Sequence, residues 1–356
     1  MDSAVEQLLS GPRGRRLCLE LAMEKDQDIR IAVFHLGYNL DPGVGRSRKL
    51  LTMNPSGEDP PHLPELTVDE LAALITSLDL QTITDELVQH ALQRSVDTAR
   101  YWQEPDGEDV LAATEEITKS LTHVAESLVD SPETQWWNQK AQAGQSSIDW
   151  RAESDPAPLP RNPQHMLAEW ARKDRAEEIR AAKERPRDPR ANFSGEWWSI
   201  PHGLIHTVAR IPEGLSLVED SLGWEEATVI PVAGTGRILE ITTEEDWINL
   251  CRSFPLEITA SRRHDWFRTT GRHGRWVIPD WEQAATEWDA VHLTVAGYLS
   301  VAGRALPVSE DTSTVIAGWD PGSTIWLTDV ARESELPRQF WHRPRTEEQW
   351  RLTPTG

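Results

Sequence analysis

Residues 67–101, TVDELAALITSLDLQTITDELVQHALQRSVDTARY, decide the fold of the first part of the chain. Thr67 and Glu70 have the spacing of a capping box, and apolar residues then recur at helical spacing between positions 71 and 78. A second helix is expected from about 84 to 101, ended by the Pro-Asp-Gly turn at 105–107. The stretch therefore predicts two helices that share an apolar core.

The residues on either side extend this helical part. Apolar residues on one stripe predict a third helix over 108–129 that packs on the first two. Residues 29–36 form a short apolar run that predicts a strand, and 11–22 suit a helix or a strand. We expect residues 1–140 to form a mainly helical domain.

A change of composition follows. Residues 141–163 lose periodicity and gather Ser and Pro, as a linker does. Residues 164–185 then alternate acidic and basic side chains, with Glu169 and Lys173 four apart, and predict a solvated helix that stops at Pro186. We interpret 141–192 as a linker and a charged connecting helix.

From residue 193 onward the sequence pattern is typical of β-strands. Short β-branched runs are separated by Gly and Pro; they occupy 204–209, 215–218, 227–232, 237–241, 256–259 and 314–317. Helices are expected at 242–253, opened by Thr242 and Glu245, and at 279–288. The fold class is therefore α+β: an N-terminal mainly helical domain, and a Trp-rich C-terminal domain (193–356) with a largely antiparallel sheet and a few helices.

Composition limits the function. The chain has 58 acidic and 36 basic residues, a net charge of −22, which argues against nucleic acid as a bulk partner. No apolar run is long enough to span a membrane, so no membrane partner is expected. Two distant cysteines suggest no disulfide framework and fit a reducing cytoplasm. Most of the 17 tryptophans are expected in the core, with a ligand groove as the alternative.

One segment departs from this acidic background: residues 261–276, SRRHDWFRTTGRHGRW, here called the basic segment. Its arginines could hold a phosphate or carboxylate while an indole stacks on a ring. The candidate ligand-binding residues are Arg262, Arg263, His264, Trp266, Arg268, Arg272 and Trp276. The alternative is a surface strand and loop whose arginines pair with the protein's own carboxylates.

Three further residues are weak catalytic candidates. Asp289, His292 and Asp320 could supply acid and base groups if the fold brings them near the arginines. The alternative places Asp320 in a turn and His292 in a strand as a hydrogen-bonded residue. No metal site and no cofactor are predicted, because the HGLIH sequence at 202–206 lacks the catalytic Glu of zinc proteases and its glycine disfavours a helix.

Several stretches also resemble a known family. GPRGRRLCLEL, SVDTARYWQEPDGEDV, GWEEATVIPV, ITASRRHDWFRTTGR, WDAVHLTVAGYLSVAGRALPV and AGWDPGSTIWLTD look like a family of cytoplasmic actinobacterial proteins with no assigned activity. The resemblance covers most of the chain. It implies a bacterial cytoplasmic setting and transfers no catalytic residue.

The function hypotheses follow from the basic segment. The leading one is a binding or regulatory protein that holds a small anionic, nucleotide-like ligand in the C-terminal domain. The first alternative is an enzyme acting on a nucleotide-type substrate, such as an ADP-ribosyltransferase-like transferase, by analogy of fold alone. The second is a scaffold that self-associates into a homo-oligomer through its tryptophans and arginines.

Overall fold

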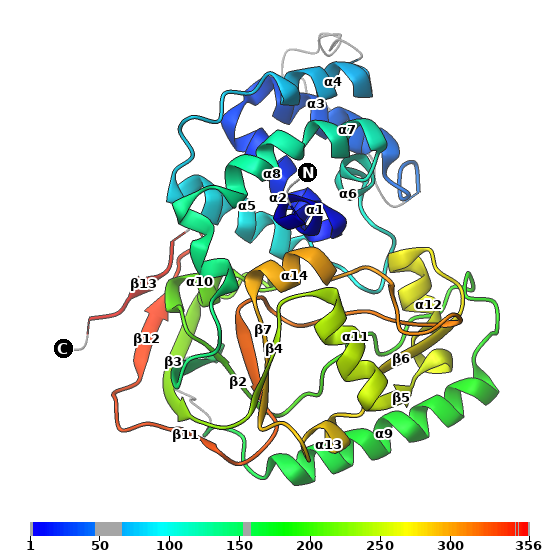
Figure 1. Ribbon diagram of the computed structural model, residues 1–356, viewed down its shortest axis with the longest axis vertical. Coiled ribbons are helices and arrows are strands. Elements are labelled where there is room, and N and C mark those ends of the chain that lie inside the picture. Colours follow the sequence, from blue (N-terminus) through cyan, green and yellow to red (C-terminus); the bar gives the residue numbers. More distant parts are fainter. Residues whose placement is uncertain (1–2, 47–65, 152–157, 346, 348, 355–356) are drawn as a thin grey trace.

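The structure is a computed structural model that describes residues 3–46, 66–151, 158–345, 347 and 349–354. Helices gather at one end and a large sheet at the other, with one short helix, α14 (Val295–Val301), between them (Figure 1). The α+β class predicted from the sequence is confirmed. Among the described residues, no helix has the length and apolarity needed to cross a membrane.

The helical end contains eight α-helices and one 3-10 helix in its described part. They are α1 (Ser3–Ser10), α2 (Pro12–Lys25), α3 (Gln27–Leu40), α4 (Val68–Thr76), α5 (Asp85–Asp97), α6 (Gly107–Ala112), α7 (Glu115–Ser120), α8 (Thr122–Val129) and η1 (Pro132–Asn138). The predicted helices at 67–78 and 84–101 correspond to α4 and α5, and the Thr67–Glu70 capping box is present. The ambiguous residues 11–22 lie in α2.

Two expectations for this end were wrong. Residues 29–36 are part of helix α3, because Asp26 caps its first turn and Ile29, Ala32 and Val33 share one buried helical face. The single helix expected at 108–129 is divided into α6, α7 and α8. Its apolar stripe is nevertheless buried, since the short helices keep those side chains on the core side.

The large sheet has nine strands in the described residues, in the order β13-β12-β3-β1-β2-β10-β7-β4 with β11 also on β3. Its strands are β1 (Gly144–Asp149), β2 (Ile205–Val208), β3 (Glu226–Gly234), β4 (Ile238–Ile241), β7 (Ala290–Leu293), β10 (Ser323–Trp326), β11 (Ala331–Glu333), β12 (Gln339–His342) and β13 (Arg351–Leu352). All pairs are antiparallel except β4 with β7. The predicted, largely antiparallel sheet is thus present.

A smaller sheet and the remaining helices lie beside it. The sheet order is β5-β6-β9-β8, formed by β5 (Pro255–Glu257), β6 (Arg275–Pro279), β9 (Thr312–Thr314) and β8 (Leu306–Pro307). The helices are α9 (Pro163–Glu184), α10 (Ile211–Ser216), α11 (Glu244–Ser253), α12 (Thr259–Thr270) and α13 (Trp281–Ala284). The run at 215–218, expected as a strand, follows Pro212 at the start of helix α10 and partly belongs to that helix.

Strand β1 lies within the stretch interpreted as a linker. It pairs with both β2 and β3, so it is an interior strand of the large sheet. Its buried side chains, Gln145 and Ser147, are polar, and Gln145 accepts a hydrogen bond from Thr207 at 2.7 Å. The usual alternation of apolar and polar residues is therefore absent, and sequence reasoning missed the strand. Residues 152–157 of the same stretch lie outside the described residues.

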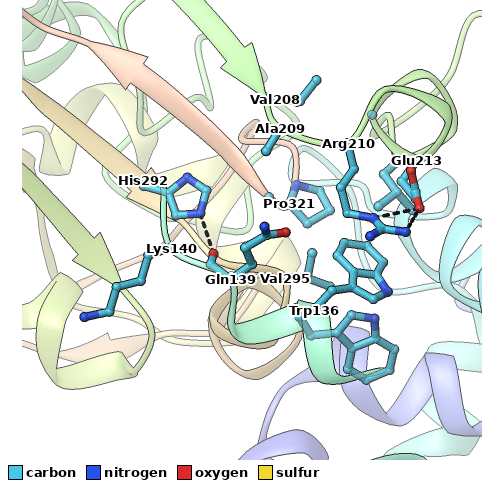
Figure 2. A pocket seen from close by; sticks show the side chains of 14 residues that line it. Trp136, Gln139, Lys140, Val208, Ala209, Arg210, Glu213, His292, Val295 and Pro321 are labelled. Atoms are coloured by element: carbon cyan, nitrogen blue, oxygen red, sulfur yellow. Dashed lines mark hydrogen bonds and ion pairs between the residues drawn. The ribbon is translucent and has the colours of Figure 1, made fainter. Parts of the chain in front are cut away.

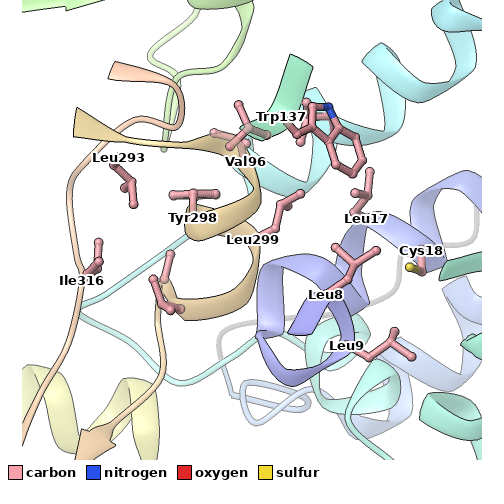
Figure 3. Packing of buried hydrophobic residues seen from close by; sticks show 14 of the residues in the cluster. Leu8, Leu9, Leu17, Cys18, Val96, Trp137, Leu293, Tyr298, Leu299 and Ile316 are labelled. Atoms are coloured by element: carbon pink, nitrogen blue, oxygen red, sulfur yellow. The ribbon is translucent and has the colours of Figure 1, made fainter. Parts of the chain in front are cut away.

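One hydrophobic cluster runs through both ends of the molecule. Leu8 and Leu17 from the helical end lie near Tyr298 and Leu299 of α14 (Figure 3). The contact is close: a Cβ at Gly11 would lie 2.1 Å from the carbonyl oxygen of Leu299. The turn between α1 and α2 can therefore approach α14 only because residue 11 has no side chain.

The tryptophans form much of the core of the C-terminal part. Trp247, Trp281 and Trp319 are fully buried, and their ring centroids lie 6.0 to 6.1 Å apart. At such distances aromatic rings prefer the edge-to-face or tilted arrangements seen here. The core interpretation of these residues is therefore confirmed.

The capping box of α4 gives a first test. Replacing Thr67 with Ala removes the side-chain acceptor of the Glu70 amide, so we expect a loss of about 1 kcal/mol in the free energy of unfolding. Chemical denaturation measures it. The control is Thr76→Ala in the same helix, where an exposed hydroxyl bonds the Ala72 carbonyl and Ala is the better helix former. Equal losses in both variants would contradict the capping role.

Candidate functional site

Most of the basic segment belongs to helix α12, not to a strand and loop. The two indoles predicted to hold a ligand are core residues: Trp266 and Trp276 are 0% and 1% exposed, with ring centroids 5.3 Å apart. The indole N–H of Trp266 donates to the carbonyl oxygen of Trp197 at 2.9 Å. Neither ring offers a free face to a ligand.

The arginines of the basic segment point to different partners. Arg268 donates to the carbonyl oxygens of Trp102 (2.9 Å) and Phe193 (2.6 Å) and to the Asp265 carboxylate (2.6 Å). It therefore ties α12 to the loop after α5 and to the loop before β2. Arg263 donates to the carbonyl oxygen of Arg187 at 3.3 Å.

The end of the basic segment is held in the same way. Arg272 donates to the carbonyl oxygens of Arg275 (3.1 Å) and Asp311 (2.8 Å), and its guanidinium lies 5.0 Å from the Trp276 ring centroid. His264 is buried beside Phe193, and burial and the charges of nearby arginines lower its pKa. Backbone carbonyls, which sequence reasoning did not consider, are thus major partners of these side chains.

The three weak catalytic candidates lie apart from the basic segment. Asp289 accepts hydrogen bonds from the Arg237 amide (2.8 Å) and from Thr328 (2.9 Å). Asp320 accepts one from the Glu219 amide at 3.0 Å, and burial raises its pKa to about 6. None of these interactions involves the basic segment.

His292 lies in strand β7, as its alternative interpretation predicted. Its ring nitrogens contact Thr324 (2.9 Å) and the carbonyl oxygen of Gln139 (3.1 Å). Burial lowers its pKa to about 4, so the ring is neutral at neutral pH. The structure does not bring Asp289, His292 and Asp320 together with the arginines.

A narrow pocket adjoins His292 (Figure 2). Trp136 lies beneath the guanidinium of Arg210, 4.7 Å from ring centroid to Cζ, and Arg210 also pairs with Glu213 at 2.7 Å. The free volume of this pocket is about 20 Å³, which is room for a single water molecule. The pocket is therefore too small for an organic ligand in this conformation.

A larger cavity, here called the α9 cavity, is the candidate site. It has a volume of about 260 Å³ and lies between α9, the start of α12 and residues 196–203. Its lining residues are Met166, Glu169, Trp170, Lys173, Asp174, Glu196, Trp198, Ile200, His202, Gly203 and Arg262. Of the basic segment, only Arg262 contributes to it.

A buried ion pair forms part of the lining. Arg262 Nη2 lies 3.1 Å from Asp174 and 3.5 Å from Glu196, and the side chains of Arg262 and Asp174 are each 2% exposed. Burial raises the pKa of Asp174, Arg262 lowers it and the neighbouring Glu196 carboxylate raises it, with a net pKa of about 6. Nε and Nη1 of Arg262 have no hydrogen-bond partner among the described residues.

Aromatic and imidazole rings complete the lining. Trp198 stacks on Trp197 with ring centroids 4.4 Å apart. The His202 ring packs edge-on against the Trp198 ring, with centroids 4.8 Å apart. Burial lowers the pKa of His202, so this ring is also neutral at neutral pH. Trp170 is half-buried on α9. Such cavities, with apolar walls and a few polar groups, are the usual form of small-molecule sites.

Sequence reasoning missed most of this cavity. Met166, Trp170 and Asp174 recur every four residues, so they lie on one face of α9. That stripe was present in the sequence, but the charges around it led to the interpretation of a solvated helix. The signal that could have indicated a buried polar site was the pair Trp170 and Asp174, an aromatic and an acidic residue four apart on a charged helix.

His202 and His206 do not form a metal site with a third ligand in the part of the chain that the structure describes. His206 lies in β2, and burial lowers its pKa to about 4. No family model, curated protein or solved structure matches the chain. The resemblance to an actinobacterial family, the cytoplasmic setting and the homo-oligomer therefore stay predictions.

Proposed function

We propose that this is a binding or regulatory protein that holds a small ring-bearing ligand in the α9 cavity. The observation that carries the proposal is a cavity of about 260 Å³ in which two half-buried indoles adjoin a buried Arg262–Asp174 ion pair. Indoles supply a large flat contact area, and the charged groups fix the orientation of a ligand.

The support for an anionic, nucleotide-like ligand at the whole basic segment is weaker than the sequence suggested. Arg263, Arg268 and Arg272 are occupied by backbone carbonyls, and Trp266 and Trp276 are buried. The site we propose therefore keeps only Arg262 from the predicted set. The enzyme alternative required Asp289, His292 or Asp320 to face the arginines, so it is not our proposal.

The proposal predicts that a ligand raises the Tm of the protein and that this rise depends on the residues lining the α9 cavity. In a thermal-shift panel of nucleosides, nucleotides, sugar phosphates and aromatic amines, we expect at least one compound to raise the Tm of the wild-type protein. Trp198→Ala should remove that shift, because the ligand loses its stacking surface. The measurement compares Tm with and without each compound.

The matched control is Trp224→Ala. Trp224 is 37% exposed and stacks on Trp150, away from the cavity lining. It should keep the ligand-induced shift, whatever its own Tm. A shift that survives in Trp198→Ala, or an empty panel, would refute the proposal.

A further inference from the structure

The charges of the α9 cavity do not balance. The lining contains three carboxylates, those of Glu169, Asp174 and Glu196, and two cations, Lys173 and Arg262. Deeper in, a single guanidinium nitrogen, Nη2 of Arg262, serves two carboxylates, those of Asp174 and Glu196. One positive charge therefore faces two negative charges.

No other lining group supplies the missing charge. His202 is neutral at neutral pH because burial lowers its pKa. The raised pKa of Asp174 follows from the same arrangement, since burial and the Glu196 charge outweigh Arg262. A cation that entered the cavity would relieve the repulsion between the two carboxylates.

The access to these carboxylates differs. Asp174 is closed off at 2% side-chain exposure, whereas Glu196 is 53% exposed. A ligand ammonium can therefore contact Glu196 directly and attract Asp174 electrostatically at longer range. Trp170 and Trp198 line the same space, and indole faces attract cations as well as flat rings.

Building on the function proposed above, we infer that the ligand of the α9 cavity is an organic cation: a ring-bearing amine whose ammonium group pairs with Glu196 while its ring packs on Trp198. The net charge of −22 on the chain supports this class, because it attracts cations over long distances.

Three indoles of different charge test the inference by isothermal titration calorimetry. Tryptamine is the cation, tryptophol is neutral and indole-3-propionate is the anion. We expect tryptamine to bind at least about tenfold more tightly than tryptophol, and the anion to bind most weakly, as a charge-assisted hydrogen bond predicts. The tryptamine affinity should fall as salt is added.

The Glu196→Gln variant locates the effect. We expect it to bind tryptamine about tenfold more weakly and tryptophol unchanged, because only the charge of the side chain is lost. Glu184→Gln is the control, since Glu184 is 64% exposed at the end of α9 and does not line the cavity.

The outcomes separate the two proposals. Equal affinity for the three indoles, or preference for the propionate, would overturn the cationic ligand and leave the cavity as a binding site. A tryptamine preference that persists in Glu196→Gln would overturn the pairing with Glu196. Failure of all three indoles together with an empty thermal-shift panel would reject the cavity as a ligand site.

Discussion

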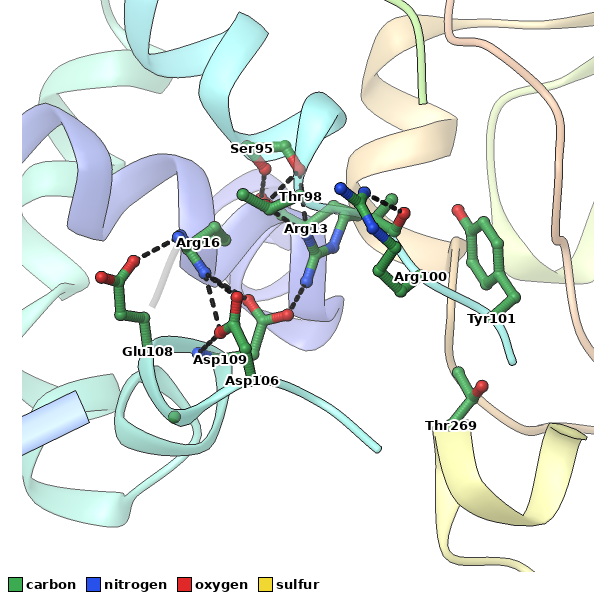
Figure 4. Close-up of polar contacts among 12 residues, drawn as sticks. Arg13, Arg16, Ser95, Thr98, Arg100, Tyr101, Asp106, Glu108, Asp109 and Thr269 are labelled. Atoms are coloured by element: carbon green, nitrogen blue, oxygen red, sulfur yellow. Dashed lines mark hydrogen bonds and ion pairs between the residues drawn. The ribbon is translucent and has the colours of Figure 1, made fainter. Parts of the chain in front are cut away.

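Replacing Arg16 with Met is expected to lower the free energy of unfolding by about 3–5 kcal/mol. Arg16 lies in α2, is 2% exposed and contacts four carboxylates, those of Glu20, Asp106, Glu108 and Asp109. Figure 4 shows the contacts with Asp106, Glu108 and Asp109. Met keeps much of the aliphatic volume and removes the charge. The large effect is expected because Glu20 and Asp109, whose side chains are 3% and 9% exposed, lose their main cation.

A second arginine of the same cluster, Arg13, does not replace Arg16. Arg13 pairs with Asp109 and donates to the carbonyl oxygen of Ser95 at 2.9 Å, so it joins α2 to α5 and to the start of α6. Arg16 lowers the pKa of Asp106 and Glu108, so without it these two carboxylates should take up protons more readily in the folded protein. The variant is therefore expected to recover part of its lost stability when the pH is lowered from 7 to 5.

Chemical denaturation at both pH values measures these two effects. Arg30→Ala is the control, because Arg30 is 46% exposed and its pair with Glu24 at 3.0 Å is of the surface type, which contributes about 1 kcal/mol or less. If Arg16→Met and Arg30→Ala destabilise the protein equally, the buried cluster does not hold the helical end together.

The second large effect is a pH dependence centred on Glu219. Burial, and then the nearby charge of Asp320, raise the pKa of Glu219 to about 7 from a usual value near 4.5. Tyr298 donates to its Oε1 at 2.8 Å and Tyr101 donates to the same atom, while Oε2 is buried without a partner among the described residues. The two tyrosine donors lower the pKa, but burial outweighs them, so the folded protein protonates Glu219 more readily than the unfolded chain does.

The sign follows from the raised pKa. The stabilisation is complete below the unfolded-state pKa, near 4.5, and is lost as the pH rises through about 7. Between pH 5.5 and 8 this group should remove about 2 kcal/mol from the free energy of unfolding. Glu219→Gln imitates the protonated form, so it should be more stable than the wild-type protein at pH 8.

Denaturant titrations at pH 5.5 and 8 check this prediction. Asp320, with a pKa raised to about 6, contributes in the same direction, so the variant should flatten the pH dependence without abolishing it. Glu245→Gln is the control, because Glu245 is 59% exposed and pairs with Arg252 at the surface. If the free energy of unfolding of Glu219→Gln changes with pH as much as that of the wild-type protein, the Glu219 carboxyl is ionised in the folded protein at neutral pH.

Local chemistry determined much of the fold directly from the sequence. The Thr67–Glu70 capping box and the apolar stripes of α4 and α5 form within one or two turns of helix, so the sequence contains the whole pattern. The short β-branched runs predicted β2, β3 and β4 in the same way. By contrast, the helix at 27–40 required knowledge of its packing, because a short apolar run suits either a strand or a buried helix.

The candidate site shows the same division. The sequence by itself determined that cations and indoles concentrate at 261–276, and it placed Arg262 among the candidates. Only the tertiary structure decided the partners: carbonyl oxygens for Arg268 and Arg272, and the Asp174 carboxylate, 88 residues away, for Arg262. Helical spacing and caps depend on neighbours in the chain, whereas a cavity and a buried ion pair depend on which distant surfaces meet when the core packs.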